Sequence, residues 1–201
     1  VAYEVGLKCR LESLETRASY YYTTIDKMIV RAPTGRMIDT YSEVTKKNSG
    51  EGYIQGVELS ETYRLNSQWS LWAMAAWMDG KVDAYPTSDA EKARDYVSRL
   101  MPPTAEVGVR WQADGGKFWC EAVGNMAAKA DKLSADDERD TQRIPPGGTP
   151  GYAVASLRAG TTAIKGLDLS VAVENLFDED YRLHGSGVNE PGRNVVLAAA
   201  Y

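Results

Sequence analysis

The sequence predicts an all-β fold, an antiparallel up-and-down meander of about nine strands that forms part of a transmembrane β-barrel. Two observations lead to this fold class. Apolar and polar residues alternate with a period of two, which is typical of strands with one apolar and one polar face. The connections between these segments are alternately short and long, and outer-membrane barrels have short turns on one side and long loops on the other.

The alternation is clearest near the start, in the middle and near the end of the chain, at 2–10, 104–113 and 167–177. In the first segment Tyr3, Val5 and Leu7 alternate with charged residues and glycine. The same pattern, bounded by turn residues, predicts strands at about 2–10, 15–30, 53–65, 69–79, 104–113, 117–130, 151–162, 167–177 and 194–201.

The predicted connections fall into two classes. Short turns are expected at 11–15, 65–69, 113–117 and 163–166. Long polar segments are expected at about 31–52, 80–103, 131–150 and 178–193. A soluble meander has no physical reason to place all its long connections at one end, so this separation favours a barrel in an outer membrane.

Aromatic residues near the short turns give a second test. Five of them fall on the apolar side of their strands and are predicted to form a girdle at one membrane interface: Tyr63, Trp69, Trp111, Phe118 and Tyr201. The alternative is that they are scattered over a soluble β-sandwich. Glu61 fits this face poorly, and either its place near the interface or a β-bulge would explain it.

Composition excludes several classes of protein. The net charge of −5 over 201 residues does not favour nucleic acid as a partner. No run approaches 18 consecutive apolar residues, so no transmembrane helix is expected. Val1 falls directly inside an alternating pattern, as in a mature or truncated piece. Cys9 and Cys120 are predicted five strand spacings apart, roughly 24 Å, which is too far for a disulfide.

Several motifs resemble one known family. They are YYYTTIDKMIVRAP at 20–33, KKNSGEGYIQGVELSETYRL at 46–65, SRLMPPTAEVGVRW at 98–111, KADKLSADDERDTQRIPPGGTPGY at 129–152 and ENLFDEDYRLHGSGVNEPGRN at 174–194. Together they resemble the barrel of TonB-dependent outer-membrane receptors, and the last motif is the most specific. The resemblance covers essentially the whole sequence but only the final nine or so strands of a 22-stranded barrel. It implies that 1–201 is one fragment of that barrel, lacking the plug domain and the first half.

The resemblance also implies a function. The chain is expected to belong to a receptor in the bacterial outer membrane that takes up a scarce ligand, most often a ferric siderophore or another iron source. Uptake would use energy relayed by the TonB complex through the plug domain. Outer-membrane lipid is the other expected partner, and neither nucleic acid nor a cofactor is expected. The chain alone is not expected to form a closed barrel.

Candidate ligand contacts come from the predicted outer loops. In segment 80–103, mixed charge and tyrosine suit a polar ligand, and the residues proposed there are Asp83, Tyr85, Arg94 and Tyr96, with Asp89 in the same loop. His184, the one histidine, is the candidate in the last loop. One histidine does not make a metal site, and the acidic run 136–140 lacks calcium-loop spacing, so it is predicted to be a solvated loop crest.

The sequence holds no catalytic constellation, so an enzyme is not expected. No G-x-S-x-G elbow and no cysteine–histidine pairing occur in it. The alternatives are a passive porin-like or adhesion barrel in the outer membrane, an outer-membrane hydrolase on a barrel scaffold, and a soluble β-sheet binding module.

Overall fold

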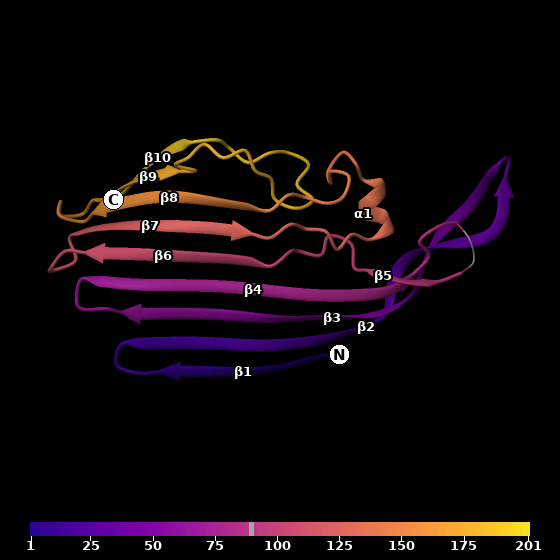
Figure 1. Cartoon of the computed structure of the whole chain (residues 1–201), viewed down its shortest axis with the longest axis horizontal. Coiled ribbons are helices and arrows are strands. Elements are labelled where there is room, and N and C mark those ends of the chain that lie inside the picture. Colours follow the sequence, from indigo (N-terminus) through magenta and orange to yellow (C-terminus); the bar gives the residue numbers. More distant parts are fainter. Residues whose placement is uncertain (89–90) are drawn as a thin grey trace.

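The chain forms one curved antiparallel sheet in a computed structural model, which describes residues 1–88 and 91–201 (Figure 1). Nine strands follow one another in chain order, and the short β5 pairs only with the outer end of β4. The strands are β1 (Ala2–Arg10), β2 (Leu14–Ile38), β3 (Tyr41–Arg64), β4 (Trp69–Ala84), β5 (Ala93–Tyr96), β6 (Thr104–Gln112), β7 (Phe118–Ala127), β8 (Tyr152–Thr161), β9 (Asp168–Glu174) and β10 (Asn194–Ala200). The predicted meander of nine strands is therefore confirmed.

The connections also separate as predicted. Figure 1 shows the β1–β2, β3–β4, β6–β7 and β8–β9 turns at one end of the sheet. The connections that follow β4, β7 and β9 lie at the other end, where the helix α1 (Ala135–Arg139) also lies. We call these the short-turn end and the long-loop end. Among the described residues, no helix is long and apolar enough to cross a membrane.

The prediction of a long polar loop at 31–52 is wrong. β2 continues to Ile38, β3 starts at Tyr41, and the two remain paired, so this segment is a hairpin that projects from the long-loop end (Figure 1). Val30 and Ala32 are buried at its base, which fixes the strand there. A register shift between Pro33 and Met37 accommodates the proline without breaking the hairpin.

Two other segments predicted as loops also contain regular structure. β4 extends to Ala84 and β5 pairs with it inside 80–103. The run 131–150 contains α1, which begins after Ser134. Asp89 lies outside the described residues.

The register divides the sheet into an apolar and a polar face. One ladder of directly opposed residues crosses eight strands and is apolar throughout: Leu14, Tyr63, Leu71, Val109, Ala122, Leu157, Val173 and Val195. The adjacent ladder on the other face carries Arg64, Ser70, Arg110, Glu121 and Arg158. The alternation read from the sequence therefore continues in register across the sheet.

Burial is the reverse of that in a soluble sheet. Val123, Val154 and Ser156 lie on the polar face and are buried. Large side chains of the apolar face, such as Leu157 at 46% exposure, remain uncovered. A soluble protein rarely exposes a contiguous apolar patch of this extent. The apolar face of this sheet therefore needs an apolar neighbour outside the chain.

Glu61 is the one carboxylate that interrupts the apolar ladders. It lies opposite Thr16 and Ala73, and pairing on both sides is continuous, so no bulge turns it away from the apolar face. Thr16 Oγ1 donates a hydrogen bond to Glu61 Oε1 at 3.4 Å. Glu61 lies one pair inward from Tyr63, and a carboxylate on a lipid-facing surface costs less than an arginine at the same depth.

The sheet is open among the described residues, because β1 and β10 each pair on one side only. This agrees with the expectation that the chain alone does not form a closed barrel. Cys9 and Cys120 lie on strands five steps apart and are free thiols, as predicted.

Aromatic side chains on the polar face lie over glycines of neighbouring strands. The Trp72 indole covers Gly108 and donates from Nε1 to Glu121 Oε1 at 2.9 Å. Any Cβ at position 108 would collide with that indole, whereas a Cβ at Gly124 would meet Val107 at 3.5 Å, an ordinary contact. Trp72 therefore needs a glycine beside it to keep its bond to Glu121.

Gly108→Ala is expected to lower the free energy of unfolding by about 1–3 kcal/mol, because the indole must shift and lose its carboxylate partner. Gly124→Ala is the matched control, with an expected change below about 1 kcal/mol. Urea unfolding of the whole receptor in lipid vesicles measures both. Equal losses for the two variants would show that Trp72 does not require the glycine.

Candidate functional site

Four predicted ligand residues lie together at the long-loop end. Pairing of β5 with β4 places Arg94 opposite Asp83 and Tyr96 opposite Lys81. The Arg94 guanidinium donates from Nε and Nη2 to the two oxygens of Asp83, each at 2.7 Å. Such a two-point pair holds β5 against β4, and each group uses the other as its main partner.

Three of these four residues lie on the apolar face, and Tyr85 is placed separately. Asp83, Arg94 and Tyr96 extend the apolar face outward, since they continue the parity of Trp77 on β4. Tyr85 follows β4, with the Lys92 ammonium 5.8 Å from its ring centre. A hollow of about 110 Å³ is lined by Tyr85, Tyr96 and the base of the β2–β3 hairpin. Ligand contact by these residues stays a prediction.

His184 lies apart from that group, in the β9–β10 connection, where its ring contacts the β7–β8 connection. Its Nδ1 is 2.9 Å from Thr149 Oγ1, and its Nε2 is buried with no partner among the described residues. The space beside it is about 10 Å³, room for about one water molecule. Burial lowers the pKa of His184, and the nearby Arg99 lowers it further against the opposing effect of Asp137. The geometry is that of a structural histidine.

Acidification is expected to loosen the contact between these two connections. The pKa of His184 in the folded protein lies below its usual value, so neutral His184 favours the folded contact. This contribution to stability is present above about pH 6.5 and is lost as the pH falls through the folded pKa. Hydrogen exchange of 128–151 and 175–193, corrected for intrinsic rates, should rise between pH 7.5 and pH 5. His184→Gln should remove that rise. A rise of the same size in the variant would rule out His184 as its cause.

Asp137 is the best-connected side chain of the long-loop end. It is 1% exposed and accepts hydrogen bonds from Ser98 Oγ at 2.7 Å and Ser134 Oγ at 2.8 Å, and from the amides of Ser134 and Arg99 at 3.0 and 3.2 Å. Burial alone would raise the pKa of Asp137, but these hydrogen bonds outweigh it and hold the pKa below its usual value. Asp137 stays ionised while buried.

The prediction that 136–140 is a solvated crest is therefore wrong for Asp137. The Ser134 hydroxyl oxygen accepts a hydrogen bond from the Asp137 amide, and the Asp137 carboxylate accepts one from the Ser134 amide. This reciprocal arrangement at the start of α1 is a capping box. The signal was available in the sequence as Ser134 followed three residues later by an acid. Among the described residues no group of three His, Cys, Asp or Glu side chains is placed to hold a metal ion.

Arg99 joins this network to the last connection. Its backbone has a φ of 62°, and its Nη1 donates to the Gly185 carbonyl at 2.9 Å. Its Nη2 donates to the Asp140 carboxylate. Segments 98–99, 134–149 and 184–185 are therefore tied into one unit, which we call the loop latch.

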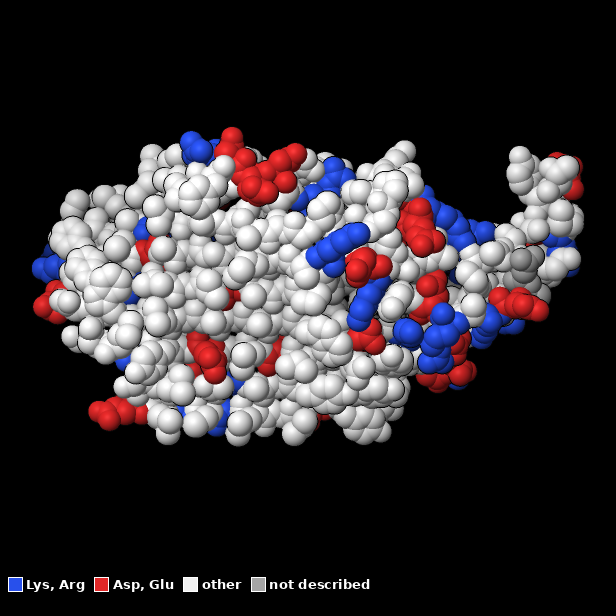
Figure 2. Space-filling view, in the orientation of Figure 1, with Lys and Arg blue, Asp and Glu red and all other residues white. Residues whose placement is uncertain are grey.

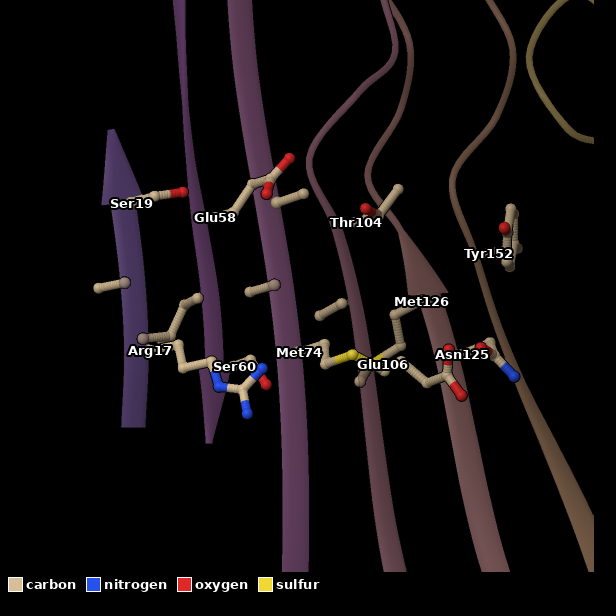
Figure 3. A pocket seen from close by; sticks show the side chains of 15 residues that line it. Arg17, Ser19, Glu58, Ser60, Met74, Thr104, Glu106, Asn125, Met126 and Tyr152 are labelled. Carbon is tan, nitrogen blue, oxygen red and sulfur yellow. The ribbon is translucent and has the colours of Figure 1, made fainter. Parts of the chain in front are cut away.

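The polar face contains a hollow of about 600 Å³ that spans six strands (Figure 3). Figure 3 shows Arg17 and Glu58 on one side, and Glu106 beside Asn125 on the other. Thr104 and Tyr152 line it nearer the long-loop end. The hollow therefore presents both charges and several hydrogen-bonding groups to whatever lies against the polar face.

The apolar face carries aromatic residues at both ends. Trp69 lies opposite Trp111 near the short-turn end, and Tyr63 and Phe118 are exposed there, in the positions predicted for the girdle. Tyr201, beyond β10, is fully exposed. Membership of a membrane girdle stays a prediction for all five. Figure 2 shows the band between the two ends almost free of charge, with Lys, Arg, Asp and Glu gathered toward α1 and β5.

Sequence reasoning missed a second aromatic row at the long-loop end. Tyr20, Tyr22, Tyr53 and Trp77 share the parity of the apolar face. Tyr22 and Tyr53 stack with ring centres 5.6 Å apart. The parity of these four residues in the sequence was the available signal, because it places them on the same face as Tyr63.

The family model described as "TonB dependent receptor-like, beta-barrel" matches residues 1–176. The chain belongs to this family. The antiparallel sheet of this chain matches the barrel fold of that family. No protein of curated function matches the sequence.

Solved structures agree with the family. The FrpB iron transporter from Neisseria meningitidis (F3-3 variant) superimposes over 100% of this chain with a TM-score of 0.77 and 18% identity. The copper transporter OprC covers 98% of the chain with a TM-score of 0.73 and 22% identity. The ferric-catecholate import receptor Fiu from E. coli K12 covers 98% with a TM-score of 0.67 and 20% identity. This TonB-dependent receptor chain spans only 27–30% of those structures.

Proposed function

We propose that this chain is the C-terminal part of the barrel wall of a transport receptor in the bacterial outer membrane. The observation that carries the proposal is the exposed apolar face, bounded at each end by aromatic residues. Members of the family are outer-membrane proteins. Lipid is the apolar neighbour that such a face requires in a barrel.

The proposed cargo is a scarce ligand, most often a ferric siderophore or another iron source. Three similar structures support this, since they are an iron transporter, a copper transporter and a ferric-catecholate import receptor. Energy would come from the TonB complex acting through a plug domain elsewhere in the receptor. The polar hollow with Arg17, Glu58, Glu106 and Asn125 faces the side where such a domain would lie. The receptor binds and transports, and we propose no catalysis for it.

The proposal includes ligand contact by Asp83, Tyr85, Arg94, Tyr96 and His184. These side chains differ in how far their present contacts leave them free for a ligand. Tyr85 has the best support, because it lines a hollow at the long-loop end. Arg94 and Asp83 would first have to exchange their mutual ion pair for the ligand. His184 has the least support, because its ring is held by Thr149.

Uptake in cells tests the function. Cells whose only ferric-siderophore receptor is the whole protein containing this chain should accumulate radioactive iron from a panel of ferric siderophores. Accumulation should saturate and should disappear when TonB is deleted. Entry that is proportional to concentration and unaffected by loss of TonB would instead establish a passive porin-like barrel. No accumulation of any metal chelate would contradict the transport proposal.

A further inference from the structure

The apolar face changes character over four successive ladders toward the long-loop end. The first ladder is apolar and aromatic, with Tyr20, Val57 and Trp77. The next two mix aromatic, polar and charged residues: Tyr22, Gln55 and Asp79, then Thr24, Tyr53, Lys81 and Tyr96. The fourth is charged, with Glu51, Asp83 and Arg94. Toward the long-loop end the apolar face therefore changes step by step from apolar to charged, and the cations lie immediately beyond a row of aromatic residues.

Two lysines from different parts of the chain lie at this boundary. Lys132, in the β7–β8 connection, donates from Nζ to Asp79 Oδ1 at 2.7 Å and lies 5.7 Å from the Trp77 ring centre. Lys81 Nζ lies 5.1 Å from the Tyr96 ring centre and forms no ion pair with any described residue. Asp79 also accepts from the Tyr53 hydroxyl at 3.2 Å. We call Lys81, Lys132, Asp79, Tyr53 and Trp77 the boundary cluster.

The boundary cluster carries one more positive than negative charge. Its single carboxylate, Asp79, pairs with Lys132, which leaves Lys81 without a carboxylate partner in the cluster. On the next ladder Asp83 pairs with Arg94, and Glu51 lies opposite Asp83. An ammonium that is partly covered by an aromatic ring and has no carboxylate gains from an anion placed beside it.

The height of the boundary matches that of a bilayer surface. From Tyr63 near the short-turn end to Tyr53, β3 advances ten residues, roughly 34 Å along the strand, or about 26 Å along the normal at a tilt of about 40°. The apolar band of outer-membrane barrels is about 25 Å tall. Because Lys81 lies directly opposite Tyr53, its ammonium lies where lipid headgroups begin, provided that the proposed membrane location is correct.

We propose that Lys81 and Lys132 hold the phosphate group of an anionic lipid whose acyl chains lie along the apolar face below them. Trp77 and Tyr53 lie beneath the phosphate and contact the first part of the lipid tails. Asp79 competes with the phosphate for Lys132 through their ion pair and limits how much negative charge the cluster accepts. This inference rests on the proposed function, because it needs a bilayer against the apolar face.

Lipid binding to the purified whole receptor tests the inference. The receptor is stripped of lipid in detergent and titrated with phosphatidylglycerol or with phosphatidylcholine of the same acyl chains, and native mass spectrometry counts bound lipid. Phosphatidylglycerol should bind more tightly, and Lys81→Gln and Lys132→Gln should each weaken it about fivefold, equivalent to about 1 kcal/mol each. Lys165→Gln, in the β8–β9 turn at the other end, is the matched control and should change nothing.

An Asp79 variant and competition with inorganic phosphate test the charge of the site and its need for a whole lipid. Asp79→Asn should tighten phosphatidylglycerol binding, because it removes negative charge without shortening the side chain. Inorganic phosphate at millimolar concentration should not displace the lipid. Displacement by inorganic phosphate, equal binding by wild type and the Lys81/Lys132 double variant, or weaker binding by the Asp79 variant would each overturn the inference.

Failure here is distinguishable from failure of the proposed function. If the receptor and its lysine variants fractionate with the outer membrane and take up ligand equally, while lipid preference does not depend on the lysines, only the lipid site is refuted. If the receptor does not reach the outer membrane at all, the proposed function is refuted first.

Discussion

Arginine in place of Val107 is expected to lower the free energy of unfolding of the receptor in lipid vesicles by about 2–4 kcal/mol. Val107 lies on the apolar face of β6, two ladders inward from the Trp69–Trp111 pair. Its neighbours across the sheet are Ala73 and Gly124, which give a guanidinium no acceptor. A charge there must either stay in hydrocarbon or stretch to an interface. Urea titration in vesicles measures the loss directly.

Glu106→Arg is the matched control, one residue away on the opposite face. Its neighbours there are Met74 and Asn125, and it lines the polar hollow, so an arginine stays in a polar environment. The expected change is below about 1 kcal/mol. If both arginines cost the same, or if Val107→Arg costs nothing, the apolar face is not in contact with lipid.

The second large effect is expected from Asp137→Asn at the loop latch. The carboxylate accepts from four donors, and an asparagine of the same size would turn a donor of its own toward some of them. Arg99 would also lose its nearest buried charge, with Nε 3.7 Å from Asp137 Oδ1. Breaking such a network costs about 2–4 kcal/mol. The loss should be local to the loop latch, where hydrogen exchange of 98–100, 134–149 and 184–186 should accelerate together.

Asp136→Asn is the control that separates loss of the Asp137 hydrogen bonds from loss of a negative charge in the first turn of α1. Asp136 is also in the first turn of α1, but it is exposed and pairs only with Arg139 among the described residues. Its replacement should cost less than about 1 kcal/mol and leave exchange at 98–100 and 184–186 unchanged. If the Asp137 variant accelerates 134–149 alone, the three connections are not coupled through Asp137.

The meander was predictable because its signals are local. A period of two is visible within a few residues, and the register that links Tyr63 to Leu71 and Val109 follows once the turns are short. The same parity placed Trp69, Trp111 and Phe118 on one face. It also left Cys9 and Cys120 far apart along the sheet, as the structure shows.

The long-loop end was less predictable because its determinants are contacts between distant segments. The β2–β3 hairpin beyond Ile25 has mixed polarity on both faces, so alternation gives no signal there. Val30 is buried and lines a hollow together with Val82 and Ala84 of β4, which lie far from it in the sequence. Asp137 looks like one acid in an acidic run until Ser98 and Arg99 approach it. His184 likewise gains its structural role only from Thr149.

The central claim is that the apolar face of this sheet meets lipid, and a spin-label scan of β6 from residue 105 to 111 in the membrane-inserted receptor tests it directly. Collision with oxygen, which concentrates in lipid, should peak at 105, 107, 109 and 111. Collision with a water-soluble nickel chelate should stay low at those positions. Uniformly low oxygen collision at the odd positions would show that protein covers the face, and high nickel collision there would show that water does.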